Sequence, residues 1–512
     1  MSAPPLPGLT WLDPRSYHLF SVSGTYYLFD RATGTTAAVS EDFATALTRG
    51  CSSDAATGSA FESLLQILRG QGFFHYEPLD HAKQEEQLEG LWQHKPRRIQ
   101  LLMAQGCNLG CRYCYAWRNG SNQKGTLMPF DVAKQAVDFL IERSGSRSDL
   151  QVTFFGGEPL LNLETIRDVV TYCRGLELTG SKCFTFEIIT NGVLLTPEVT
   201  DWMVQEKFLL MISLDGWKEM HRYNRPSLTK SDDHEVIVRH AQYANEQYMV
   251  HGLGAVKIRA NLTDKFHDTQ SVFDYLRSLG FSNIGMSVIE PLPHGDNSPS
   301  ALTEDQLDEL TEVNRQKMIL ALEQIERGED PGEYAVREIR KRISAPETRR
   351  TKGITCGVNR NTAVVDNKGA VYPCHRYEGM PSYVVGNVFT GMDREATMGY
   401  YRKVNRNATN RCHSCWLRDY CAGGCAWLLS AKDGTIHDPT ERECDRRRAG
   451  MEFALYMRQR LRQVKPGWFQ KEENDLLSQL NLFGDVSPED ALSDGSSSCG
   501  SGCGDCGSGC GS

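Results

Sequence analysis

Cysteine is the residue that most constrains this chain. Of 17 cysteines in 512 residues, 14 fall into three clusters, Cys107–Cys114, Cys356–Cys444 and Cys499–Cys510. The opening residues MSAPPLPGLTWLDPRS lack the basic and apolar regions of a secretion signal, so we expect a cytoplasmic protein. Because disulfide frameworks are rare in that compartment, clustered thiols there favour ligation of soft metal centres.

Composition excludes several other classes. Hydrophobic residues make up 40% and charged residues 24%, which is typical of globular domains, and 512 residues suggest three or four folded units. The net charge of −9 argues against a nucleic-acid partner, which would need a basic face. No apolar run is longer than the five residues Phe208–Ile212, so we expect no membrane span.

Residues 1–85 predict a small β unit with two helices. Strands are expected at Tyr17–Val22 and Tyr26–Asp30, helical spacing follows Ser40, and a short strand is expected at Phe73–Tyr76. This order resembles the winged-helix peptide-recognition element of modified-peptide biosynthesis, in which a leader peptide adds a strand beside the β unit. A structural cap on the next domain is the alternative.

Residues 95–345 alternate strand and helix signals, which predicts an α/β domain with a parallel sheet. Six units suggest an incomplete (β/α)6 barrel, with function at the carboxyl ends of its strands. The expected strands are Ile99–Ala104, Gln151–Phe155, Phe184–Thr190, Leu209–Leu214, Ala255–Ala260 and Ile284–Val288.

The first cysteine cluster follows the first barrel strand. Cys107, Cys111 and Cys114 have the spacing C-x3-C-x2-C. Three thiolates on one tight loop can hold three irons of a cubane and leave the fourth iron open. A structural zinc site normally needs four protein ligands, and this loop has no adjacent histidine.

This arrangement resembles the radical S-adenosylmethionine (SAM) enzymes, whose triplet has an aromatic before its last cysteine, here Tyr113. Further family motifs follow in order at the ends of the next strands. The resemblance implies SAM as a cofactor and a [4Fe–4S] cluster on the triplet. It makes Gly156, Gly157, Glu158, Asn191, Ser213 and Arg225 candidates to bind SAM. Turn glycines, loop capping and surface pairing are the plainer alternatives for these residues.

The second cluster, in residues 346–465, resembles the SPASM extension of radical SAM peptide-modifying enzymes. Its pattern is C-x12-G-x4-C, then C-x2-C-x5-C-x3-C, then a last cysteine. The resemblance implies two auxiliary [4Fe–4S] clusters, for three in all. A distal cluster would use Cys412, Cys415, Cys421 and Cys444, and a proximal one Cys356, Cys374 and Cys425.

The proximal set lacks a fourth cysteine. An open iron there could bind a substrate thiolate and place its sulfur near a carbon radical, which points to thioether formation. His375 or a water filling that position is the alternative, and a zinc-binding double knuckle is the structural alternative for the whole region.

The remaining cysteines predict less. Residues 480–512 are rich in Gly, Ser and Cys, and we expect a disordered tail. It could mimic a Cys-rich substrate, deliver thiols or iron–sulfur units, or be dispensable. Cys51, Cys173 and Cys183 are expected to be buried structural thiols.

Together these features predict a radical SAM enzyme that modifies a ribosomally made peptide, by linking a cysteine sulfur to carbon. Expected partners are the precursor peptide and an electron donor such as a flavodoxin or ferredoxin. The alternatives are formylglycine formation, a carbon–carbon crosslink, and a non-catalytic iron–sulfur scaffold that binds a leader peptide. No spacing selects a general base.

Overall fold

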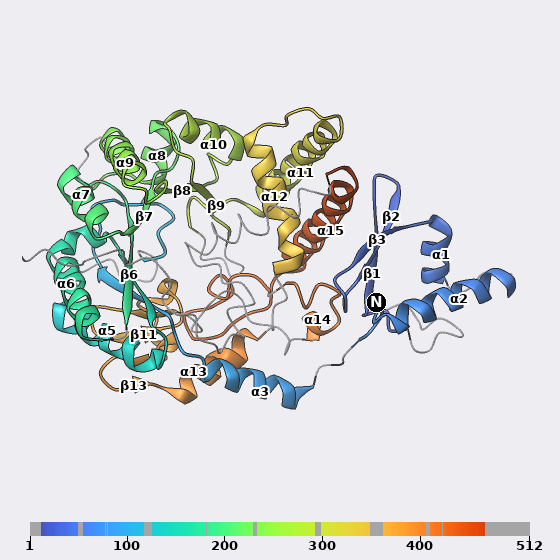
Figure 1. The fold of residues 1–512 in the computed structure, drawn as a ribbon, viewed down its shortest axis with the longest axis horizontal. Helices are drawn as coiled ribbons and strands as arrows, with labels where there is room; N and C mark the ends of the chain where they lie inside the picture. Colours follow the sequence, from blue (N-terminus) through green and yellow to red (C-terminus); the bar gives the residue numbers. More distant parts are fainter. Residues whose placement is uncertain are drawn as a thin grey trace, which may run out of the picture.

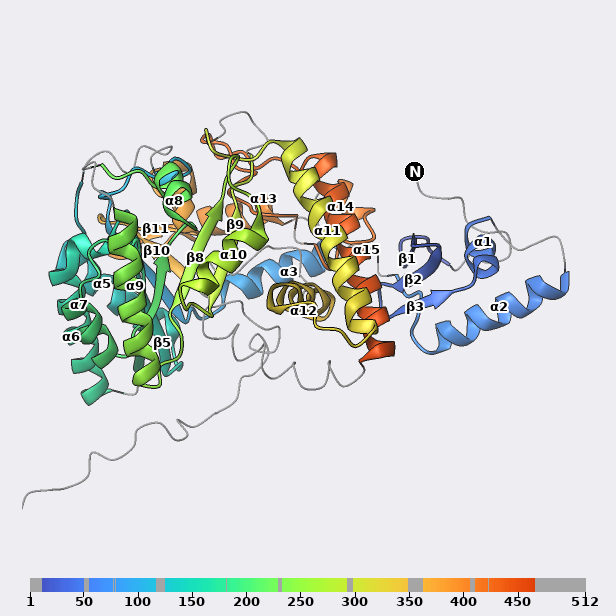
Figure 2. The same ribbon diagram turned by 90° about the horizontal axis from the view of Figure 1, so that it is seen from above.

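The fold places an open sheet with surrounding helices beside a small N-terminal β unit (Figures 1 and 2). It is known from a computed structural model. The model describes residues 12–49, 55–76, 78, 80–116, 125–180, 182–228, 233–291, 298–348, 362–405, 410–421 and 423–465. The expected tail over 480–512, together with Cys51 and Cys356, lies outside these residues.

The N-terminal unit is a three-stranded antiparallel sheet, in the order β1-β2-β3, followed by helices. Ser23 and Gly24 both have positive φ, 51° and 77°, which suits the two-residue turn of a hairpin. The Ser40 hydroxyl accepts the N–H of Phe43 at 3.1 Å and caps the first helix. The elements are β1 (Tyr17–Val22), β2 (Thr25–Asp30), β3 (Thr36–Val39), α1 (Glu41–Arg49), α2 (Ala55–Gly70) and α3 (His81–Trp92).

The strand expected at Phe73–Tyr76 is wrong, because β3 is the third strand and it precedes the helices. Phe74 has φ 60°, a left-handed conformation that cannot continue a strand. Its N–H donates to Asp30 Oδ2 at 2.7 Å, and its ring lies edge-on to Tyr17 at 5.9 Å. The segment therefore closes the small core of the unit instead of extending its sheet.

The six barrel strands expected from the sequence are confirmed, each within two residues at its ends. They pair in parallel in the order β4-β5-β6-β7-β8-β9. The strands are β4 (Arg98–Ala104), β5 (Asp149–Gly156), β6 (Cys183–Thr190), β7 (Leu209–Ser213), β8 (Lys257–Leu262) and β9 (Ile284–Val288). The intervening helices are α5 (Phe130–Ser144), η2 (Pro159–Asn162), α6 (Leu163–Thr179), α7 (Pro197–Gln205), α8 (Lys218–Asn224), α9 (Asp233–Val250) and α10 (Thr269–Ser278).

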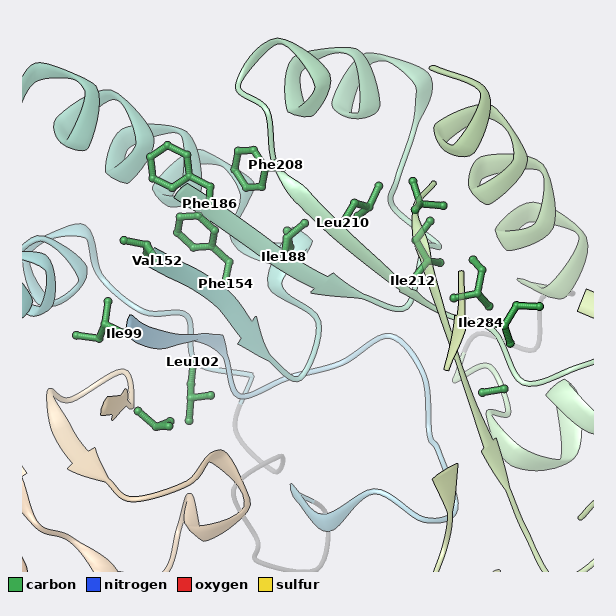
Figure 3. Close-up of a cluster of buried hydrophobic side chains, with 14 of the residues drawn as sticks. Ile99, Leu102, Val152, Phe154, Phe186, Ile188, Phe208, Leu210, Ile212 and Ile284 are labelled. Atoms are coloured by element: carbon green, nitrogen blue, oxygen red, sulfur yellow. The ribbon is translucent and has the colours of Figure 1, made fainter. Parts of the chain in front are cut away.

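The barrel core lies between the outer face of the sheet and these helices (Figure 3). Phe154 of β5, Phe186 of β6 and Phe208, which directly precedes β7, stack at centroid distances of 5.4–6.2 Å. The inner face is more polar, since Glu187 Oε2 accepts from Gln151 Nε2 at 2.9 Å and from Thr153 Oγ1 at 2.8 Å. Apolar packing thus fixes the strands from outside, and their inner face carries polar groups.

The C-terminal region extends the same sheet. Strand β10 pairs in parallel with β4, and the three following strands are antiparallel. Helices α11 and α12 pack against the last helix, α15, which carries Cys444. The elements are α11 (Glu304–Glu326), α12 (Glu333–Thr348), β10 (Thr362–Val365), β11 (Ala370–Tyr372), η3 (His375–Tyr377), η4 (Pro381–Tyr383), β12 (Gly386–Asn387), β13 (Gly391–Met392), α13 (Arg394–Val404), α14 (Asn410–His413) and α15 (Glu441–Val464).

The N-terminal unit docks on five residues between two cysteines of the second cluster, the docking segment 416–420. Trp416 stacks on His18 at 3.9 Å, with ring planes 3° apart. Buried Arg31 pairs with Asp419 at 2.5 Å. The Tyr420 hydroxyl donates to the Arg31 carbonyl at 3.3 Å. The β unit is thus attached directly to a cysteine-bearing loop.

Two further sequence expectations can be compared with the fold. Cys173 is fully buried in α6, as expected. Cys183 is exposed, contrary to expectation, because it is the first residue of β6 and lies on the face opposite to that of the buried Phe184. Within the described ranges, none of the helices has the length and apolar character needed to cross a bilayer.

Replacing Trp416 tests the docking of the N-terminal unit. Truncating a large buried aromatic to alanine costs about 3–5 kcal/mol, so we expect Trp416→Ala to weaken docking by about that amount. Hydrogen exchange of the β1 and β2 amides should become faster. Trp202→Ala, a change on the barrel exterior beside Phe208, is the control and should leave those amides unchanged. Equal exchange in both variants would contradict the docking role.

Candidate active site

The first cysteine cluster lies on a loop directly after β4, the triplet loop of residues 106–114. All three thiols are partly exposed. The Leu109 N–H donates to Cys107 Sγ at 3.4 Å, and the Cys114 N–H to the Cys111 carbonyl at 3.1 Å. The Gly110 N–H also donates to the Pro226 carbonyl at 2.8 Å. The loop is therefore folded tightly and tied to the segment that follows α8.

Gly156 and Gly157 hold the triplet loop from the end of β5. The N–H groups of Gly157 and Glu158 donate to the carbonyls of Ala104 at 2.7 Å and Gly106 at 3.0 Å. A Cβ on Gly157 would lie 2.0 Å from the Gly106 oxygen, and Gly156 has φ 124°. Gly156 and Gly157 are therefore needed because the triplet loop packs directly against their backbone. The loop, more than a ligand, restricts these two positions to glycine.

Glu158 is fully buried and joins the ends of β5 and β6. Its carboxylate accepts from Leu160 N at 3.0 Å, Thr190 Oγ1 at 2.7 Å and Asn191 N at 2.8 Å. Burial raises the pKa of Glu158 to about 7, against these hydrogen bonds. A carboxylate has about four acceptor sites, so one remains for another donor.

Asn191 contacts the triplet loop. Its Nδ2 donates to Asn108 Oδ1 at 2.7 Å and lies 3.6 Å from Cys107 Sγ. Ser213 ends β7 beside Arg259 of β8, is partly exposed, and donates no hydrogen bond to the part of the chain that the structure describes. Asn191 therefore orients the cysteines, and the Ser213 hydroxyl is available to a ligand.

Arg225 and Asp215 form a buried ion pair beside Cys111. Arg225 Nε lies 2.9 Å from Asp215 Oδ2, and these side chains are 8% and 0% exposed. The Tyr113 hydroxyl donates to the same carboxylate at 2.6 Å. The sequence predicts that Arg225 binds SAM or pairs at the surface. It does not single out Asp215 as a site residue, although Asp215 follows the fourth strand just as Arg225 does.

The four cysteines expected for the distal cluster line one cavity. Four arginines line it too, and each of them is paired with a nearby carboxylate. The cavity carries Cys412, Cys415, Cys421 and Cys444, with Arg411, Arg418, Arg447 and Arg448. Burial raises the pKa of Cys444 to about 11, so its thiolate needs a compensating cation.

Cys374 and Cys425, expected for the proximal cluster, lie near one another across the C-terminal region. The charge of Cys425 contributes to the raised pKa of Cys374, about 11, for which burial is the main cause. Arg376 Nη1 lies 3.8 Å from Cys425 Sγ. Their expected partner Cys356 is outside the described residues.

His375 faces the barrel from its position beside Cys374. Its Nδ1 lies 3.2 Å from Gln100 Oε1 on β4, and its ring packs on Phe155 at 4.8 Å and Tyr115 at 5.5 Å. Burial lowers the pKa of His375 to about 3. One ring nitrogen is therefore engaged with the barrel.

The cysteine sets fit clusters better than a single ion. A zinc ion needs all its donors within about 2.3 Å of one point. In the described ranges no group of three or more His, Cys, Asp or Glu side chains converges in that way. In a cubane each thiolate binds a separate iron, so thiols spread around a cavity are suitable. The thiols around the four-cysteine cavity therefore fit iron–sulfur ligation.

Comparisons with known proteins agree with the motifs. The Radical SAM superfamily model matches residues 101–297. The radical SAM cyclopropyl synthase TigE of Paramaledivibacter caminithermalis is 23% identical over 391 residues, 70% of this chain and 77% of TigE. A cysteine-type anaerobic sulfatase-maturating enzyme of Clostridium perfringens is 22% identical over 344 residues, 64% of this chain and 88% of that enzyme.

A solved structure has the same fold. Native anSMEcpe with bound AdoMet and Cp18Cys peptide superposes with a TM-score of 0.55 at 21% identity, over 70% of this chain and 97% of that one. These comparisons confirm the resemblance to radical SAM enzymes that the motifs indicate, and they confirm the α/β fold class. They also confirm the expectation of a [4Fe–4S] cluster and SAM.

Substituting Gly157 tests how the triplet loop is held. We expect Gly157→Ala to displace the loop, because the new Cβ would overlap the Gly106 carbonyl. Iron and sulfide per chain after anaerobic reconstitution should fall by the share of one cluster. The control is Gly175→Ala on α6, where a Cβ meets nothing within 4 Å. It should keep all iron and gain about 0.5–1 kcal/mol of stability. Full iron content in Gly157→Ala would refute the contact.

A second prediction concerns Glu378, which is buried near the triplet loop and accepts from Gln105 Nε2 at 3.4 Å. Burial raises its pKa to about 7, with Asp366 adding to the shift. The folded state therefore binds an extra proton between about pH 4.5 and 7, and stability falls as pH rises through that window.

Glu378→Gln should remove this part of the pH dependence. At pH 8 the variant should be more stable than the parent by up to about 3 kcal/mol, and near pH 4.5 the difference should vanish. Urea unfolding of the iron-free chain at several pH values measures it. Glu158 titrates in both proteins and cancels in the comparison. Parallel stability curves would show that burial does not raise the pKa of Glu378.

Proposed function

From the premise that this chain is a radical SAM enzyme, we propose that it modifies a ribosomally synthesised peptide by linking a cysteine sulfur to carbon. When bound, the reduced cluster and SAM supply a 5′-deoxyadenosyl radical, which removes a hydrogen atom from an unactivated carbon. The chain's own residues bind and orient the reactants, as set out below.

Cys107, Cys111 and Cys114 would hold the catalytic cluster. Around it, Ser213 offers a hydroxyl that has no hydrogen-bond partner among the described residues, and Glu158 retains one acceptor site suited to an ammonium group. Gly156 and Gly157 expose backbone beside the same loop. We propose that these groups and Asn191 line the SAM site, with Arg225 close to it.

The number of cysteines available to each auxiliary cluster supports the thioether proposal. The distal set has four cysteines around one cavity, whereas the proximal set has Cys374 and Cys425 together with Cys356. Three ligands leave one iron of a cubane for an outside thiolate. A peptide thiolate or His375 Nε2, whose partner nitrogen Nδ1 contacts Gln100, would complete that iron, and we propose the thiolate.

The named relatives support a peptide substrate in general. The anSMEcpe structure contains a peptide, and a Clostridium perfringens relative is a cysteine-type sulfatase-maturating enzyme. These likenesses favour formylglycine formation as much as a thioether, and the name of TigE favours chemistry between carbons. The proximal set, which has only three cysteines, favours the thioether among these three products.

The N-terminal unit would bind the precursor peptide by strand addition, since β1 and β3 are edge strands of its sheet. We propose domains at 1–85, 95–345 and 346–465 for peptide recognition, radical chemistry and auxiliary clusters, with a tail at 480–512. A flavodoxin or ferredoxin would supply electrons, and the reaction would take place in the reducing cytoplasm.

The products distinguish these possibilities. Reduced enzyme, SAM and a Cys-rich peptide encoded nearby should give a product that lacks two hydrogens and one alkylatable thiol. A carbon–carbon link, or formylglycine made from serine, would also remove two hydrogens but consume no thiol. Formylglycine made from cysteine would remove the sulfur from the peptide. Retention of every thiol after turnover would refute the thioether.

Cys107→Ala provides the control for catalysis. It removes one of the three cluster ligands, so cleavage of SAM to 5′-deoxyadenosine should be lost. The Cys183→Ala variant, altered at an exposed thiol outside the clusters, should cleave SAM at the normal rate. Reduced protein that never cleaves SAM would instead favour the non-catalytic scaffold.

A further inference from the structure

Arg225 is held rigidly at the end of α8 by a carboxylate that has no other cationic partner among the described side chains. Asp215 accepts from Asn261 N at 2.9 Å, from Tyr113 Oη at 2.6 Å and from Asn224 Nδ2 at 3.3 Å. Arg225 Nε lies 2.9 Å from the same carboxylate as an ion pair without hydrogen-bond geometry. With these donors in place, neither charge can turn toward solvent.

The guanidinium of Arg225 also faces the triplet loop. Its Nη1 lies 3.9 Å from Cys111 Sγ, and its centre lies 5.4 Å from the Tyr113 ring. Arg225 is 7% exposed, so water screens this charge poorly. A fixed positive charge therefore lies against a sulfur that the proposed function assigns to the cluster.

Arg112 offers a natural contrast on the same loop. It follows Cys111 directly, yet it is exposed. Its Nε donates to the Tyr223 carbonyl at 2.8 Å, and its guanidinium lies over the Tyr223 ring at 4.6 Å. Two arginines thus lie close to Cys111, with Arg225 after α8 buried against the sulfur and Arg112 on the loop in solvent.

We propose that the Asp215–Arg225 pair tunes the reduction potential of the cluster held by the triplet loop. Reduction adds one electron, and the positive charge of Arg225 stabilises the more negative reduced state. The carboxylate of Asp215 opposes this effect from the far side of the guanidinium and keeps it in place. Arg225 is thus a positioning residue that acts through Cys111. The inference rests on the proposed function only in requiring a cluster at this loop.

The test is a redox titration of the full, reconstituted chain, followed by electron paramagnetic resonance with and without SAM. Only the cluster that binds SAM should change its signal when SAM is added, which identifies it among the others. Four variants are compared with the parent: Arg225→Gln, Arg225→Lys, Asp215→Asn and Arg112→Gln. Iron and sulfide content and SAM affinity are measured for each.

The expected shifts have opposite signs. Arg225→Gln should lower the reduced fraction, with the ratio of reduced to oxidised cluster falling about tenfold at a fixed solution potential, equal to about 59 mV for one electron. Asp215→Asn should raise that fraction, because the opposing charge is gone and Arg225 remains. Arg225→Lys should shift it less than Arg225→Gln. Arg112→Gln should leave it unchanged, since water screens that charge.

Other outcomes would overturn the inference. Unchanged potentials with intact clusters in all variants would exclude electrostatic tuning. Weaker SAM binding by Arg225→Gln at an unchanged potential would assign Arg225 to the SAM carboxylate instead. Arg225→Gln and Asp215→Asn could both reduce the amount of cluster bound while the cluster that still forms keeps the parent's reduction potential. The pair would then support the structure of the loop and would not tune the potential. A parent chain that forms no SAM-responsive cluster would refute the proposed function itself, a separate failure.

Discussion

The contact between the backbones of residues 106 and 157 is the constraint on which the site depends. Two hydrogen bonds join the end of β5 to the start of the triplet loop, and no side chain fits between them. This contact fixes where the loop leaves β4, and Asn191 and the segment after α8 hold the loop from its other sides. Three strand ends therefore determine the position of three sulfurs.

Buried charge is concentrated where the strands end. Glu158, Asp215 and Arg225 are almost completely buried, and each lies within the network around the triplet loop. Burying such groups is costly unless their hydrogen-bonding capacity is used. Glu158 accepts from three donors, and Asp215 accepts from three donors and pairs with Arg225. A polar network of this kind makes the region rigid and sets the electrostatic environment of its thiols.

Much of this could be predicted from local pattern. Alternating strand and helix signals gave six strands in the correct order, and cysteine spacing picked out thiols that the fold brings together at Cys412, Cys415, Cys421 and Cys444. Contacts between distant residues could not be predicted in this way. The partners of Arg225 and the orientation of His375 depend on packing between segments, as does the pairing of β10 with β4. Phe74 shows a local limit, because its apolar surroundings favour a strand while its contact with Asp30 imposes a turn.

The docking segment belongs to two structures at once. Trp416, Asp419 and Tyr420 support the N-terminal sheet, while Cys415 and Cys421 on either side line the four-cysteine cavity. We expect a change that makes the cavity more rigid to make the attachment of the N-terminal sheet more rigid as well. A change at the sheet should affect the cavity in turn, because coupling between two sites is reciprocal. Loss of iron from the four-cysteine cavity would then weaken the attachment of the N-terminal sheet, although β1–β3 lie far in sequence from every proposed metal ligand.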